Sequence, residues 1–348
     1  VMCMKKYVLV LCTLLLLCGC GKKEEKVKTD LKFDEDSYSV YEPYKSGVSN
    51  DYVVSHILNH YDREEVESSL MDISTSYFPT DNTYYQAGQY LSEKDLTSLL
   101  SKEKMNQADA VTIDGISISP EYISYIYEQN YLSSEGKLKG VSIAVVLNPY
   151  QQYQNQYGAY QYKKVDESTV LEFGKKRAQE LLTYLREEKN LKDVKILLGL
   201  YVQNGPDEVL PGSFKQVGIT SSADISFQSV DYQYQLLESN WVQEKDMNSY
   251  TAFQNLKKKL AEVFPTTYMV AEGLYVSGRL QNLEIDVHST YMNKSELLKI
   301  SQLISTELSN TFPGGIQMKV YLKENNDMVG FISKEKTSSS ARIYIMKG

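Results

Sequence analysis

The sequence contains no cysteine after Cys20, and this absence excludes several kinds of chemistry for most of the chain. All four cysteines lie within the first twenty of 348 residues, at positions 3, 12, 18 and 20. The remaining chain therefore forms no internal disulfide, binds no metal through thiolates and offers no cysteine nucleophile. Disulfide-stapled folds and cysteine-dependent enzymes are excluded together.

Positive charge is also scarce. The chain has 37 Lys and Arg against 45 Asp and Glu, which gives a formal charge of −8. Residues 1–19 contain two lysines and no acid, so the rest of the chain carries −10. Phosphate contacts need clustered Lys and Arg, and we therefore expect no nucleic-acid partner. Attraction to anionic lipid headgroups is disfavoured for the same reason.

No apolar run in the N-terminal segment is long enough to span a bilayer. The uncharged stretch 7–18 follows two lysines and is about half of the ~20 residues that a membrane-crossing helix needs. A basic start, a short apolar core and small residues before a cysteine are typical of a secretory signal. The ending Leu-Cys-Gly-Cys resembles a bacterial lipobox, which implies cleavage between Gly19 and Cys20 and palmitate-type lipidation of Cys20. An uncleaved N-terminal anchor is the alternative.

This leader sets the expected organisation of the chain. We expect a signal peptide over 1–19 and a lipoprotein held by Cys20 on the extracytoplasmic face of the cell membrane. Residues 20–50 are rich in Lys, Glu and Asp and are predicted to be a disordered tether, because they cannot bury enough apolar surface to fold. A first unit over 51–223 and a second over 248–348 follow, joined by a linker at 224–247.

An internal repeat indicates the fold class. Two helical patterns end in the same tripeptide, Phe-Pro-Thr, at 78–80 and at 264–266, where proline stops the helix. Strands, a second amphipathic helix and two closing strands then follow in each copy, with the second helices at 170–186 and 295–308. We therefore predict an α+β fold of two tandem α-β-β-α-β-β repeats, with helices packed on one side of mainly antiparallel sheets.

The first copy carries an insertion over 92–138. A helix is predicted at 120–130, because Pro120 and Glu121 are typical of a first helical turn.

Catalytic motifs are few. The sequence has neither a Gly-x-Ser-x-Gly elbow nor a glycine-rich phosphate loop. His56 and His60 have the spacing of one helix face, but no third metal ligand is evident. We expect no enzymatic activity, no cofactor and no metal site. The alternative is a cell-envelope enzyme of the wall-hydrolase type, with a site between the repeats.

The strongest candidate for ligand binding is a tyrosine- and glutamine-rich loop after the strand 140–147. Tyrosines combined with amides stack on sugar faces or bind peptides. We therefore predict an envelope peptide or glycan as ligand; the alternative is a hairpin whose tyrosines pack on one another. The candidate residues are Tyr150, Tyr153, Tyr157, Tyr160 and Tyr162.

These motifs together resemble the CamS family. The resemblance extends from about residue 39 to 345 and includes Phe-Pro-Thr-Asp at 78–81, Asn-Leu-Lys-Asp at 190–193 and Pro-Gly-Ser-Phe at 211–214. It implies an exported lipoprotein of Gram-positive bacteria with no established enzymatic activity. It also implies that a sex pheromone peptide is released from the end of the signal peptide, here the region from Thr13 to Gly19.

Overall fold

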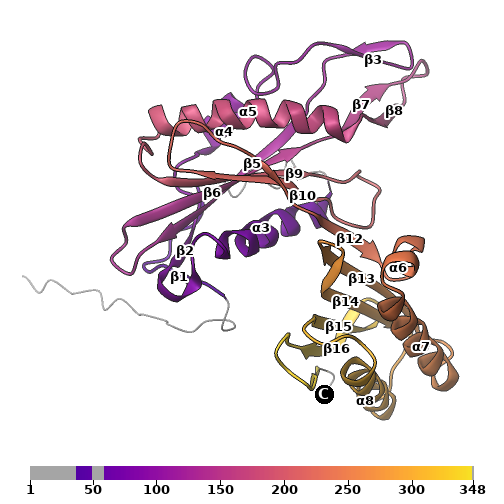
Figure 1. Cartoon of the computed structure of the whole chain (residues 1–348). Helices are drawn as coiled ribbons and strands as arrows, with labels where there is room; N and C mark the ends of the chain where they lie inside the picture. Colours follow the sequence, from indigo (N-terminus) through magenta and orange to yellow (C-terminus); the bar gives the residue numbers. More distant parts are fainter. Residues whose placement is uncertain (1–36, 49–58, 347–348) are drawn as a thin grey trace, which may run out of the picture.

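The computed structural model describes residues 37–48 and 59–346, which form a mixed α+β fold with two large β-sheets and two hydrophobic cores (Figure 1). The predicted signal peptide, its cleavage site at Gly19 and Cys20, and most of the predicted tether lie outside these residues. None of the helices in the described ranges has the length and apolarity needed to cross a bilayer.

The first sheet has seven strands, and its centre contains a parallel pair. The neighbours β6 and β9 run parallel and are connected through helix α5 (Glu167–Glu187), and β1 is parallel to β2, while the other neighbours are antiparallel. In spatial order the strands are β1 (Ser39–Val40), β2 (Tyr84–Ala87), β5 (Ile123–Leu132), β6 (Leu138–Leu147), β9 (Lys195–Val202), β10 (Ser213–Thr220) and β11 (Gln228–Ser229).

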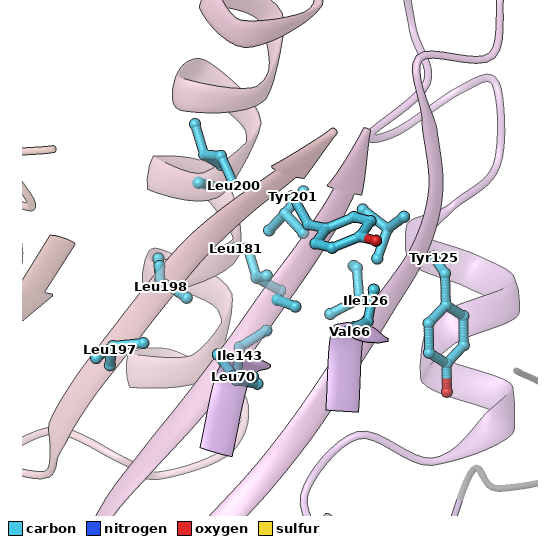
Figure 2. Close-up of a cluster of buried hydrophobic side chains, with 14 of the residues drawn as sticks. Val66, Leu70, Tyr125, Ile126, Ile143, Leu181, Leu197, Leu198, Leu200 and Tyr201 are labelled. Carbon is cyan, nitrogen blue, oxygen red and sulfur yellow. The ribbon is translucent and has the colours of Figure 1, made fainter. Parts of the chain in front are cut away.

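Helices cover both faces of this sheet, α3 (His60–Thr75) on one side and α5 on the other (Figure 1). Figure 2 shows Leu70 of α3, Leu181 of α5 and Ile143 of β6 within one cluster of buried side chains. The expectation that helices pack on one side only is therefore wrong for this sheet. The physical reason is the unbroken burial of β6, whose last eight residues are all buried, since an apolar run without alternation suits a strand covered on both faces.

The helix predicted at 120–130 is also wrong, because this segment forms strand β5, antiparallel to β6. The alternation of Ile123, Tyr125 and Tyr127 and the high strand propensity of these residues outweigh the helix-start signals of Pro120 and Glu121. The tyrosine-rich segment that ends at Ala87 is strand β2, which pairs with the other edge of β5.

The second sheet has six strands and is covered on one face, by α7 (Met247–Val263) and α8 (Lys294–Asn310) (Figure 1). Its strand β14 alternates between buried and half-buried residues, as a one-sided sheet requires. β14 and β15 run parallel and are connected through α8, and the other neighbours are antiparallel. In order the strands are β12 (Tyr232–Leu236), β13 (Tyr268–Val276), β14 (Arg279–Ser289), β15 (Gln317–Glu324), β16 (Asp327–Lys334) and β17 (Arg342–Ile345).

Residues 224–247 contain β11, β12 and the short helix α6 (Asn240–Lys245). Through Tyr234 this segment also links β12 of the second sheet to α3, because the Tyr234 hydroxyl donates to Glu65 Oε2 at 2.5 Å. The hydroxyl of Ser69 donates to the other carboxylate oxygen of Glu65. Burial raises the pKa of Glu65 to about 7, against the effect of these two donors.

Smaller elements flank the first sheet, and some of them project from the end where β6 and β9 finish (Figure 1). A single turn η2 (Thr80–Asn82) precedes β2, and helix α4 (Glu93–Leu99) begins with a capping box between Ser92 and Asp95. Two hairpins, β3 (Val111–Ile113) with β4 (Ile116–Ile118) and β7 (Tyr150–Gln154) with β8 (Tyr160–Lys164), project together from this end (Figure 1).

Candidate ligand-binding cleft

A cleft of about 650 Å³ opens at the carboxyl ends of the parallel strands β6 and β9. Asn148 directly follows β6 and Gln203 directly follows β9, and both line the cleft. The backbone N–H of Gln203 donates to Leu147 O at 3.0 Å, which holds the two strand ends side by side. Ligand sites commonly lie outside the carboxyl ends of neighbouring parallel strands.

The lining is polar and carries no net charge. Five amide side chains and six hydroxyl-bearing side chains contribute to it, with only Leu100 and Ile123 as apolar members. Its one lysine and one glutamate form an ion pair, with Lys102 Nζ 3.2 Å from Glu121 Oε1. Such a surface suits a neutral ligand that is rich in hydrogen-bonding groups.

Two amides of the lining hold the walls in place. Asn106 Nδ2 donates to Leu100 O at 2.9 Å and to Ile123 O at 2.8 Å, and Ile123 N donates back to Asn106 Oδ1 at 2.9 Å. Gln151 links β7 to the segment before β5, since its Oε1 accepts from Glu121 N at 2.7 Å. Both side chains are buried, so the cleft is preformed.

The predicted tyrosine loop forms the hairpin β7–β8. Its five candidate tyrosines have different environments: two line the cleft, one is buried and two are exposed. Tyr150 and Tyr162 line the cleft. Tyr153 is buried and donates to Asp114 Oδ2 at 2.7 Å in the β3–β4 turn, so it fixes one hairpin to the other. Tyr157 and Tyr160 are 84% and 67% exposed and are not part of the lining.

The wall formed by Tyr150 depends on a glycine. A Cβ on Gly205 would lie 2.9 Å from the Tyr150 ring, so the ring rests on bare backbone there. The ammonium group of Lys164 lies 5.3 Å from the centroid of the same ring. Beside it, Gln152 Nε2 donates to the Tyr162 hydroxyl at 2.9 Å. The aromatic wall therefore has fixed partners on several sides.

The sequence interpretation missed Asn148, Gln203 and Ser124 as members of this site. Ser124 Oγ donates to Gln203 Oε1 at 2.7 Å, and Gln203 is only 4% exposed. The signal that could have identified Asn148 and Gln203 is positional, because a polar residue directly after a buried strand marks the end of that strand. Ser124 lies within β5 and carries no such signal.

The histidines give no second candidate. His56 lies outside the described residues, and His60 is the first residue of α3. His288 lies on β14, where its ring stacks on Tyr268 with centroids 4.8 Å apart. Within residues 37–48 and 59–346, no group of three or more His, Cys, Asp or Glu is arranged to hold a metal ion.

The chain is thus a mixed α+β protein with two large sheets and a preformed polar cleft. It belongs to the family described as CamS sex pheromone cAM373 precursor, whose model matches residues 44–340, and the family resemblance of the sequence is confirmed. No curated protein matches the chain.

Two solved structures are similar to it. A sex pheromone precursor from Lactobacillus salivarius subsp. salivarius UCC118 has a TM-score of 0.83 at 22% identity, covering 92% of this chain and 99% of that one. The C-terminal domain of the sex pheromone staph-cAM373 precursor from Staphylococcus aureus has a TM-score of 0.73 at 25% identity, covering 85% of this chain and 100% of the other. The α+β fold agrees with these relatives.

Proposed function

We propose that this protein is a non-catalytic binding lipoprotein of the cell surface, whose cleft takes a polar peptide or glycan of the cell envelope. The observation that supports this best is the lining of the cleft, where amides and hydroxyls surround a neutral, preformed hollow beside two tyrosines. A small number of fixed polar groups with aromatic walls is typical of ligand sites.

Replacing Tyr150 with alanine is expected to weaken ligand binding about tenfold, because the ring forms one wall of the cleft. The measurement is isothermal titration of the full chain with a cell-wall digest that contains both glycan and peptide fragments. Tyr157→Ala removes a tyrosine from the same hairpin outside the cleft and should bind as the unaltered chain does. Absence of any fragment binding by the unaltered chain would contradict the proposal.

Anchoring rests on the lipobox sequence before Cys20. Replacing Cys20 with alanine is expected to shift the protein from the membrane fraction into the medium, because stable attachment of an acidic chain requires acyl groups. Fractionation followed by immunoblotting measures this, and Cys12→Ala within the apolar stretch is the matched control. Unchanged membrane retention of the Cys20 variant would refute lipid anchoring.

Membership in a pheromone-precursor family supports a second role for the leader. The peptide from Thr13 to Gly19 is then an intercellular signal, released when the signal peptide is processed. A synthetic peptide of this sequence is expected to induce clumping or plasmid transfer in recipients that respond to family peptides, and a scrambled peptide should not. If such recipients show neither clumping nor plasmid transfer with the authentic peptide, this role is contradicted.

The proposed organisation is two copies of one α-β-β-α-β-β unit, over 51–223 and 248–348, joined at 224–247. In support, a helix, an antiparallel pair, a crossover helix and a second antiparallel pair succeed one another around both β6–β9 and β14–β15. A hydrolase site between the copies is the alternative and has less support. Such a site would need a carboxylate that is free to act as an acid or base. Both oxygens of Glu65, which bonds to Tyr234 of the joining segment, instead accept hydrogen bonds from within the protein.

A further inference from the structure

Gln203 has an amide group that its surroundings satisfy only in part. The residue is 4% exposed and lines the cleft, and its Oε1 accepts from Ser124 Oγ at 2.7 Å. Its Nε2 has no acceptor among the residues that the structure describes. This Nε2 is not fully enclosed by the protein, so it reaches the cleft, where a ligand oxygen can accept a hydrogen bond from it.

Asn148 supplies a second such group beside it. Asn148 Oδ1 accepts from Tyr150 N at 2.9 Å, while Nδ2 has no acceptor within the described part of the chain. Since Gln203 N bonds to Leu147 O, the two amides stand on adjacent strand ends. The cleft therefore offers two neighbouring N–H donors that are fixed through their own carbonyl oxygens.

We propose that the cleft binds a neutral oligosaccharide bearing N-acetylamino sugars, with Gln203 and Asn148 donating to adjacent oxygens of one sugar ring. This inference rests on the proposed binding function and narrows its ligand to one class. Vicinal hydroxyls and the acetamido carbonyl place acceptors on neighbouring ring positions, which matches two adjacent donors. The Tyr150 and Tyr162 rings supply the apolar surface on which a sugar face stacks.

A peptide fits this lining less well. Extended peptides are held by a row of backbone groups on a strand edge, with apolar pockets for alternate side chains. Here the polar groups are side chains distributed around the cleft, and Leu100 and Ile123 are the only apolar residues of its lining. An anionic ligand is disfavoured too, because Lys102 is already paired with Glu121.

The test uses the purified full chain, chitotetraose (a tetramer of N-acetylglucosamine) and tetra-alanine as probes. Isothermal titration is expected to show binding of the sugar and not of the peptide. Gln203→Met keeps the volume and removes the donor, and it should weaken sugar binding about tenfold, whereas Tyr157→Ala should not. Hydrogen–deuterium exchange on the unaltered chain gives an independent measure: the sugar should protect the backbone around residues 148–151 and 203–205.

Each outcome bears on a different statement. Sugar binding without protection of these two loops, or unchanged affinity in a folded Gln203→Met variant, would overturn the assignment of the site. Binding of tetra-alanine or wall peptides with no response to the sugar would overturn the ligand class and leave the proposed binding function intact. If neither the probes nor the wall digest bind, the proposed function fails as well.

Discussion

Glu128→Ala should lower the free energy of unfolding by about 4 kcal/mol, one of the two largest losses expected from a single substitution in this chain. Glu128 lies on β5 and is 4% exposed. Its carboxylate accepts from three successive backbone N–H groups, those of Gln89 at 2.9 Å, Tyr90 at 3.0 Å and Leu91 at 2.7 Å. The truncation leaves three N–H groups without this acceptor, that of Leu91 buried and those of Gln89 and Tyr90 half-buried. Urea unfolding measures the change.

The same interaction controls one wall of the cleft, because the segment held by Glu128 leads directly into α4 and the turn after it. Gly88 makes the approach possible, since a Cβ there would lie 2.8 Å from Glu128 Cβ. Glu135→Ala is the control: its exposed ion pair with Lys137, 2.9 Å long, lies in the next turn and should contribute little. A loss below about 1 kcal/mol for Glu128→Ala would show that the donors find other partners.

Asp62→Ala should also have a large effect, lowering the free energy of unfolding by about 4 kcal/mol at acidic pH. Asp62 is fully buried in the first turn of α3. Its Oδ1 accepts from the Tyr201 hydroxyl and from Gly212 N, both at 2.6 Å, and its Oδ2 from Asn204 N at 3.1 Å. The carboxyl group thereby fixes the loop that begins at Gln203, so the variant should also weaken binding in the cleft.

The size of this effect should depend on pH. Burial raises the pKa of Asp62 from 3.8 to about 6, against the opposing effect of its three donors. Between these values the folded protein retains the proton that the unfolded chain has lost. The stability contributed by this group is therefore complete below about pH 4 and declines as the pH rises to about 6. At about 1.4 kcal/mol per pKa unit, the difference between the unaltered chain and Asp62→Ala should shrink by roughly 2–3 kcal/mol over this range.

Urea unfolding at about pH 4.5 and about pH 7.5 measures this change. Glu64→Ala, on the exposed side of the same helix, should unfold like the unaltered chain at both values. A destabilisation by Asp62→Ala that stays equal at the two pH values would mean that the carboxyl group titrates normally in the fold.

Sequence patterns predicted most of the regular elements but not how they are assembled. The helices around Leu70, Leu181, Leu256 and Ile304 were predictable, because each has an apolar face with helical period. The strand at β5 was not, because local helix-start signals near Pro120 compete with a pairing to β6 that is visible only in the folded chain. Covering of the first sheet by two helices could have been anticipated from the nearly continuous apolar run at 141–147, because a strand without alternation suits burial on both faces.

The cleft was predictable only in part. Its tyrosines stood out by composition, but which of them reach the cleft depends on the β7–β8 register, which places Tyr150 and Tyr162 at the lining and Tyr157 in the turn. Gln203 and Asn148 carry no local motif. Their proximity arises because β6 and β9 are parallel neighbours separated by a 21-residue helix, and no short-range pattern encodes this.

The sandwiching of the first sheet between α3 and α5 also restricts where this family can diversify. Substitutions inside β6 or β9 disturb packing on two sides at once, so we expect these strands to change little among relatives. The loops around the cleft are not packed on two sides in this way. They span residues 100–124, 148–164 and 203–212. Relatives that bind different ligands should therefore differ in the length and composition of these loops, while their central strands remain similar.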